Sequence, residues 1–126
     1  MKPLVIVIDD MPGFIPIEDW RDAIEADFEV ITDPRQALTS PRLKEATCIL
    51  LDHRMPHMTG AEVAVELRAM GVTVPIYKTG SFNESGYPED CMHIGKMLSN
   101  RVMKAVLKNA LGEITREDLL HVIHKY

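Results

Sequence analysis

Two stretches decide how this chain folds: VIVIDDMPG at residues 5–13 and CILLDHRMPHMTGAEVAVELRAMGVTVPI at residues 48–76. Each contains a short, unbroken apolar run, Leu4–Ile8 in the first case and Thr47–Leu51 in the second, and aspartate follows each run at once. Apolar runs of this length without polar alternation are typical of strands buried on both faces of a sheet. The two stretches therefore predict two buried strands whose carboxyl ends carry acidic groups.

Strands and helices alternate along the rest of the chain. Further strands are predicted at residues 28–32 and 72–77, and residues 11–16 and 80–90 read as loops because they are rich in turn-forming residues. Helix starts are signalled by apolar spacing or by capping residues at Ile17, Asp33, Thr59, Ser99 and Thr115. This alternation predicts an α/β fold built around a parallel sheet.

Size and composition limit the classes of protein to consider. The chain has 126 residues, 46% of them hydrophobic, which suits one domain with a packed core. Its formal net charge is −5 and it has no Lys/Arg-rich run, so we expect no nucleic-acid partner. No apolar segment is long enough for a signal peptide or a membrane span, and Cys48 and Cys91 lack CxxC spacing. We therefore expect a cytoplasmic protein with reduced thiols and no membrane contact.

Three carboxylates follow predicted strands: Asp9 and Asp10 after the first, and Asp52 after the third. Ligand sites in parallel sheets lie beyond the carboxyl ends of the strands, so these groups should converge there. Clustered carboxylates next to buried strands are costly unless a cation compensates them, and oxygen-only ligation suits Mg²⁺. The alternative is that each aspartate only caps the helix after it.

The same residues resemble the response-regulator receiver family. That family has an acidic pair after strand one and an aspartate after strand three, followed at fixed spacing by Met-Pro and Gly, as in Asp52, Met55-Pro56 and Gly60 here. The resemblance covers about residues 1–111, strongly as far as Pro75. It implies a flavodoxin-like, doubly wound sheet of five parallel strands in the order 2-1-3-4-5.

The resemblance also implies a role for each acidic residue. Asp52 would be the phosphoacceptor, a nucleophile that takes a phosphoryl group from a phosphohistidine. Asp10 and Asp52 would bind Mg²⁺ directly and Asp9 through water, and the backbone carbonyl of Arg54 would complete the protein's ligands. A cation is also what the chemistry requires, because a carboxylate attacking phosphorus must overcome repulsion between anions.

The region after the fourth strand departs from the family pattern. The family places there a Thr or Ser that contacts the phosphate, and Thr79, Gly80 and Ser81 all compete for that position, with Thr79 favoured. Lys78 is unusual inside a strand that is normally apolar. The stretch that follows is too short for a whole helix plus a strand, so helix four is expected to be shortened or missing.

The end of the chain allows two alignments. In the first, CMHIGKMLSNRVMKAVLKNALG at residues 91–112 is strand five and its helix, Lys96 contacts the phosphate, and His93 takes the position of a switching aromatic. In the second, residues 114–126 are that helix and the lysine is Lys108 or is missing. We favour the first, which makes residues 1–112 the receiver domain and residues 113–126 a C-terminal helical extension of it.

The resemblance predicts a stand-alone phosphoacceptor receiver of a two-component phosphorelay. Its partners would be a histidine kinase or histidine phosphotransfer protein as donor and an unidentified protein target, with a homodimer as a further option. The alternative is a pseudo-receiver that binds protein without phosphorylation. A dehalogenase-type phosphatase is disfavoured because it needs an aspartate two residues after its nucleophile, where this chain has Met11, Pro12 and Arg54. We therefore do not expect a dedicated enzyme.

Overall fold

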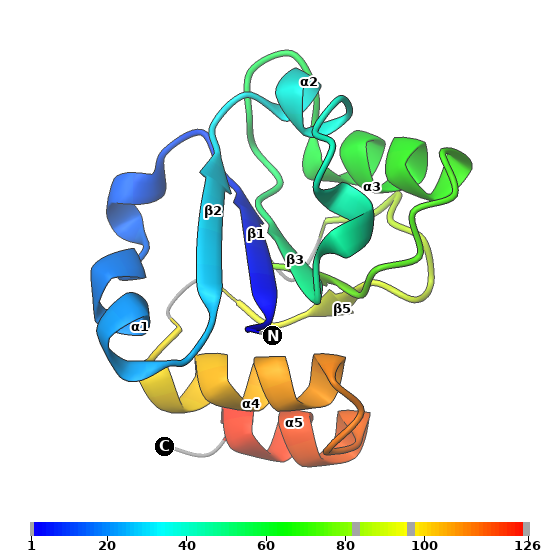
Figure 1. Ribbon diagram of the computed structural model, residues 1–126. Helices are drawn as coiled ribbons and strands as arrows, with labels where there is room; N and C mark the ends of the chain where they lie inside the picture. Colours follow the sequence, from blue (N-terminus) through cyan, green and yellow to red (C-terminus); the bar gives the residue numbers. More distant parts are fainter. Residues whose placement is uncertain (1, 82–83, 96–97, 125–126) are drawn as a thin grey trace.

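A single parallel sheet of five strands forms the centre of the computed structural model, which describes residues 2–81, 84–95 and 98–124 (Figure 1). The strand order is β2-β1-β3-β4-β5, which confirms the expected order 2-1-3-4-5. The strands are β1 Leu4–Ile8, β2 Asp27–Ile31, β3 Cys48–Leu51, β4 Ile76–Lys78 and β5 Met92–His93.

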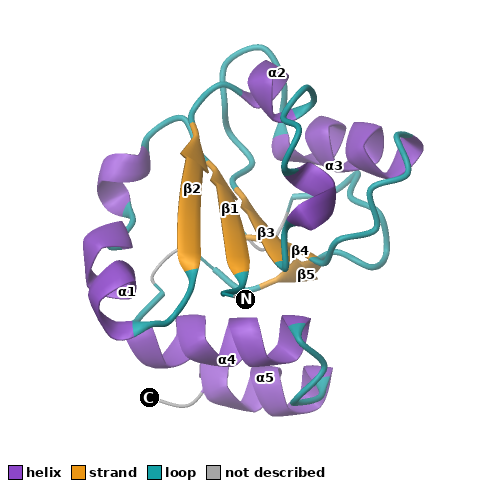
Figure 2. Cartoon of the chain, viewed as in Figure 1, coloured by secondary structure: helices purple, strands orange, loops and turns teal. Residues whose placement is uncertain are grey.

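Helices cover both faces of the sheet (Figure 2). On one face lie α1 and α4, and on the other α2 and α3. The α-helices are α1 Ile17–Ala23, α2 Pro34–Ala37, α3 Gly60–Ala69, α4 Asn100–Ala110 and α5 Arg116–His124. Two 3-10 turns, Pro12–Phe14 and Leu43–Glu45, complete the described elements. The first of these turns lies within residues 11–16, which the sequence predicts as a loop.

The central strand β1 shows why the chain folds in layers. All five of its residues are buried, and alternate side chains enter different cores. Val5 and Val7 pack toward α1 and α4, whereas Leu4, Ile6 and Ile8 pack toward α2 and α3. A strand that is covered on both faces needs apolar residues at every position, which is the pattern read from the sequence.

Local capping signals are confirmed at two helices. Thr59 and Glu62 form a reciprocal capping box at the start of α3, and Gly71 follows the end of this helix with φ of 84°. The Ser99 hydroxyl accepts the Val102 N–H at the start of α4. These bonds satisfy backbone groups that a helix end leaves open.

The fourth strand is shorter than predicted. Only Ile76–Lys78 pair as a strand, although residues 72–77 were expected to. The Arg68 guanidinium explains part of the difference, because its Nη1 donates to the carbonyls of both Val72 and Val74 at 2.9 Å. Those carbonyls are thus bonded to a side chain of α3.

No helix lies between β4 and β5 in the described residues of that segment, 79–81 and 84–91. This confirms the expected loss of helix four. The segment 84–91 covers part of the core on the α3 side instead, through Tyr87 and Cys91.

The last helix, α5, packs against α4 (Figure 1). The spacing of Leu119, Ile123 and Tyr126 predicts that these side chains point inward. Leu119 is indeed fully buried in the core that α1 and α4 share, and Ile123 packs at its margin. Tyr126, predicted to point inward as well, lies outside the described residues. Because α4 directly follows β5, the structure agrees with the first alignment of the C-terminal region. Among the described helices, none combines the length and apolar character needed to cross a bilayer.

Candidate functional site

Backbone hydrogen bonds hold three strand ends together at the carboxyl edge of the sheet. The N–H of Asp9 donates to the last carbonyl of β2, at 3.1 Å. The N–H of Asp52 donates to the last carbonyl of β1 at 3.0 Å, and that of Thr79 to the last carbonyl of β3 at 2.9 Å. Each residue is the first one after its strand. The alignment of the parallel strands therefore brings Asp9, Asp52 and Thr79 to the same edge of the sheet.

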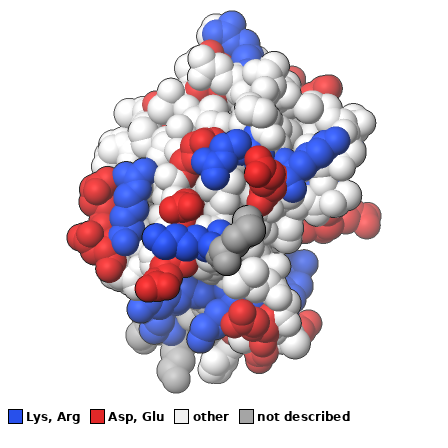
Figure 3. Space-filling view, viewed as in Figure 1, with Lys and Arg blue, Asp and Glu red and all other residues white. Residues whose placement is uncertain are grey.

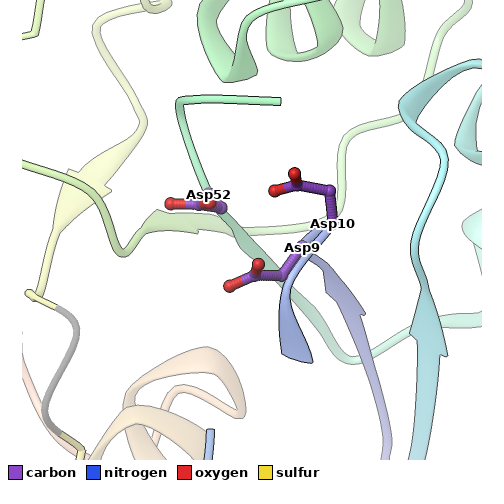
Figure 4. Close-up of side chains that lie close together, drawn as sticks. All are labelled: Asp9, Asp10 and Asp52. Carbon is purple, nitrogen blue, oxygen red and sulfur yellow. The ribbon is translucent and has the colours of Figure 1, made fainter. Parts of the chain in front are cut away.

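The three aspartates form one cluster (Figure 4). Each of Asp9, Asp10 and Asp52 offers one carboxylate oxygen, and these oxygens all lie within 4.8 Å of one another. Asp9 and Asp52 are only 1% and 5% exposed, whereas Asp10 is half-buried. Oδ1 of Asp9 accepts the Met11 N–H at 2.8 Å, which orients that carboxylate. An oxygen-only donor set of this size fits a divalent cation such as Mg²⁺, which keeps several waters.

A cavity of about 350 Å³ opens next to Asp52. It is lined by residues from the loops after β3 and β4: Asp52, Arg54, Thr79, Gly80, Ser81 and Glu84. The three competing positions after β4 all border it. Thr79 is buried and follows the strand directly, whereas Ser81 is exposed. The geometry thus favours Thr79 as the hydroxyl nearest the strand end.

Glu84 was not among the residues singled out from the sequence. Its position follows from how the segment after β4 folds back, and neither its spacing nor its neighbours in the chain indicate that it lines this cavity. The one feature of the sequence that points to this arrangement is Lys78, which is unusual inside a strand and binds the segment that contains Glu84. Lys78 Nζ donates to the Glu84 carbonyl oxygen at 3.0 Å.

His53 and Tyr87 are in contact with each other beside the site. The place of His53 in the loop after the third strand predicts an exposed side chain, but the residue is half-buried, and its Nδ1 lies 2.9 Å from the Tyr87 hydroxyl. The sequence around Tyr87 leaves two alternatives open, an exposed anchor for a partner or a ring packed on the core in place of helix four. The structure agrees with the second, because the ring packs on the core beside α3. Burial, and after it the negative charges of Glu84 and Asp52, raise the pKa of Tyr87 above its usual value. The same two alternatives were open for Phe82, which lies outside the described residues.

Lys78 is buried, with 6% of its surface exposed. Its ammonium group lies 4.6 Å from the centre of the Tyr87 ring, in addition to its bond to the Glu84 carbonyl. A buried cation needs such partners, and an aromatic face provides one. The lysine that looked out of place in the strand therefore anchors the segment that replaces helix four.

The other candidate site residues predicted from the sequence lie in different environments. His93 lies on β5, and its Nε2 is 2.8 Å from the Gly80 carbonyl oxygen, so this nitrogen is the donor. The Arg54 side chain is exposed, and the residue borders the cavity. Lys96 lies outside the described residues. The alternative, Lys108, is exposed in the last turn of α4, the far end of the helix from the strand that precedes it.

On the face drawn in Figure 3, Lys and Arg side chains are interspersed with Asp and Glu, and neither sign of charge covers a broad area. Recognition of a long polyanion usually needs many clustered cations. That face thus offers no broad basic surface.

Comparison with known proteins finds solved structures of the same fold. No family model and no curated protein matches the sequence. Among solved structures, a CheY-like response regulator receiver domain from Methylobacillus flagellatus is similar with a TM-score of 0.74 and 13% identity, covering 87% of this chain and 99% of that one. The receiver domain of sensor histidine kinase PA1611 from Pseudomonas aeruginosa PAO1, whose structure has a magnesium ion coordinated in the active site cleft, reaches 0.72 with 23% identity, over 89% and 99%.

A third similar structure is the signal receiver domain of the putative response regulator NarL from Mycobacterium tuberculosis. Its TM-score is 0.67 and its identity 27%, covering 88% of this chain and 98% of that one. All three structures match almost over their full length, so the likeness concerns a whole domain. The chain therefore has the fold of response-regulator receiver domains.

Proposed function

We propose that this protein is a phosphoacceptor receiver of a two-component phosphorelay, phosphorylated on Asp52 in the presence of Mg²⁺. The observation that carries the proposal is the cluster of Asp9, Asp10 and Asp52, whose carboxylate oxygens lie within 4.8 Å of one another. The cavity beside Asp52, bordered by Thr79, provides space for a phosphoryl group. The fold shared with receiver domains gives independent support.

The chemistry assigned to Asp52 is nucleophilic. One carboxylate oxygen attacks the phosphorus of a phosphohistidine, the P–N bond breaks, and the imidazole of the donor leaves with that electron pair. The product on this chain is an aspartyl phosphate. Thr79 would donate a hydrogen bond to the new phosphoryl oxygens, and Lys96 would pair with their charge.

The cation would be held by Asp10 and Asp52, with Asp9 acting through water and the Arg54 carbonyl as a further ligand. Bound there, Mg²⁺ supplies positive charge that offsets the repulsion between the carboxylates and the incoming phosphoryl group. A magnesium ion in the cleft of the PA1611 receiver domain supports this choice of metal by analogy. The donor set of carboxylates, without sulfur or imidazole, agrees with it.

The partners follow from this chemistry. A histidine kinase or a histidine phosphotransfer protein would supply the phosphoryl group, and the signal would leave through a protein–protein contact with a target or with a second copy of the chain. No substrate is turned over in this scheme, because the acceptor is the protein's own side chain.

A pseudo-receiver is the second candidate. It is favoured by the segment that replaces helix four, where Lys78 donates to the Glu84 carbonyl and lies over the Tyr87 ring. Such a surface would bind its partner in a single conformation that does not depend on phosphorylation. The retained acidic cluster is the observation against it, since a constitutive binding module has no need of three converging carboxylates.

Labelling with acetyl phosphate separates the two candidates. We expect wild type to gain the mass of one phosphoryl group in millimolar Mg²⁺, and Asp52→Asn to gain none, because an amide is a poor nucleophile. Asp22→Asn, an exposed position on α1, is the matched control and should label like wild type. Wild type that takes up no phosphate, or Asp52→Asn that labels normally, would contradict the proposal.

A further inference from the structure

Glu84 places a fourth carboxylate in the cavity beside the phosphoacceptor. It lines the same 350 Å³ space as Asp52 and Thr79, and it lies in the same loop after β4 as Thr79. Its Oε1 is buried and has no hydrogen-bond partner among the described residues. An unsatisfied buried carboxylate oxygen costs free energy, so the surrounding structure must hold it in place.

Two contacts hold Glu84 there. Its backbone carbonyl accepts a hydrogen bond from Lys78 Nζ at 3.0 Å, and Lys78 is itself buried under the Tyr87 ring. Gly80 leaves the space that the carboxylate fills, because a Cβ at this position would collide with Glu84 Oε1. The carboxylate is thus packed against the loop after β4, next to the residue that would contact a phosphate.

The charge of Glu84 reaches the groups around the phosphoacceptor. After burial, the charges of Glu84 and Asp52 both raise the pKa of the Tyr87 hydroxyl, so both carboxylates lie near enough to act on that group. In a space of this size, partly shielded from water, like charges repel much more strongly than they do in bulk solvent. A phosphoryl group entering the cavity would meet this charge.

We propose that Glu84 is a specificity-determining residue of the phosphorylation site, one that slows phosphoryl transfer to Asp52 and discriminates against donors of high negative charge. The inference rests on the proposed function. Glu84 is not a ligand of the cation in this scheme. It acts by repulsion, and the phosphorylated state forms as its carboxylate leaves the cavity.

The test compares two small donors with different charge. Acetyl phosphate is doubly negative at neutral pH, and phosphoramidate carries less negative charge. We expect Glu84→Gln, which keeps the shape and removes the charge, to label roughly three- to tenfold faster with acetyl phosphate and to show a smaller gain with phosphoramidate. The gain should shrink as ionic strength rises, a response that a purely structural role would not produce.

Glu89→Gln is the matched control, since it removes the same charge from an exposed position of the same segment that does not border the cavity. It should label at the wild-type rate with both donors. The Mg²⁺ concentration that half-saturates labelling should be the same in wild type and Glu84→Gln. A large increase of that concentration in Glu84→Gln would make the residue a metal ligand and overturn the inference.

Two further outcomes separate this inference from the proposed function. Labelling that Asp52→Asn abolishes, but that Glu84→Gln leaves at the wild-type rate or accelerates equally for both donors, would overturn the role of Glu84 alone. Absence of labelling in wild type and in both glutamate variants would overturn the proposed function, and the inference with it.

Discussion

The Nδ1 atom of His53 lies 2.9 Å from the hydroxyl oxygen of Tyr87, and the two rings are 5.7 Å apart between centroids. His53 directly follows Asp52, while Tyr87 belongs to the segment that replaces helix four. Gly60 makes the contact possible, because any Cβ there would collide with the Tyr87 hydroxyl and with the Asp52 carbonyl oxygen. A change at Asp52 can therefore reach the segment 84–91 through one hydrogen bond.

Replacing Tyr87 with phenylalanine tests this connection. The ring and its contact with Lys78 stay, but the bond to His53 is lost, so we expect the free energy of unfolding to fall by about 1 kcal/mol. Amide hydrogen exchange in residues 84–91 should become faster, since this segment loses a contact that orders it. Native-state exchange detected by mass spectrometry measures this directly.

Tyr77→Phe is the control for Tyr87→Phe. The Tyr77 hydroxyl donates to Asn109 Oδ1 at 2.6 Å, on the face of the sheet that carries α4. Its loss should cost a similar amount of stability without changing exchange in 84–91. Equal exchange in that segment for wild type and Tyr87→Phe would show that the His53 bond does not order it.

Crowded carboxylates make the stability of the fold depend on Mg²⁺. Asp9, Asp10 and Asp52 repel one another, and a cation that binds only the folded state stabilises it by mass action. We expect a higher melting temperature in millimolar Mg²⁺ than in NaCl of equal ionic strength. Asp10→Asn should melt higher than wild type without Mg²⁺ and gain little from adding it. A wild-type melting curve that saturating Mg²⁺ leaves unchanged would argue against a metal site.

The parts of the fold that could be predicted are those governed by local chemistry. The apolar run Leu4–Ile8, the cap at Thr59 and the stop at Gly71 all correspond to observed boundaries. The clustering of Asp9, Asp10 and Asp52 followed from the same logic, because parallel strands end at one edge of the sheet.

What could not be predicted depends on contacts between distant residues. The burial of Lys78 was an anomaly in the sequence, and only the path of residues 84–87 shows that a carbonyl and an aromatic ring receive its ammonium group. The polar segment around Tyr87 left open whether its ring is exposed or packed, and tertiary packing sets the ring on the core beside α3. The same path of residues 84–87 also places Glu84 at the cavity.

Alkaline pH should weaken the fold. Burial raises the pKa of Cys48 from 9.0 to about 12 and that of Cys91 from 9.0 to about 11. These thiols stay protonated in the folded protein while the unfolded chain begins to release its protons near pH 9, so the free energy of unfolding falls as pH rises from there toward the folded pKa values. Urea titrations at several pH values should show this decline, with a shallower slope for Cys91→Ala. Stability that stays level between about pH 8 and 10.5 would contradict it.

The last helix should stabilise the domain without taking part in phosphorylation. The Leu119 side chain is fully buried in the core, with 0% of its surface exposed to solvent, whereas Leu120 beside it is half-buried. Leu119→Ala leaves a cavity between α4 and α5, so we expect its free energy of unfolding to fall by about 2–4 kcal/mol, and that of the control Leu120→Ala by less. Labelling by acetyl phosphate should keep its wild-type rate in both folded variants, because α5 packs on α4 and contributes no residue to the acidic cluster or its cavity. A labelling rate that falls with Leu119→Ala under conditions where the variant is fully folded would instead connect α5 to the site.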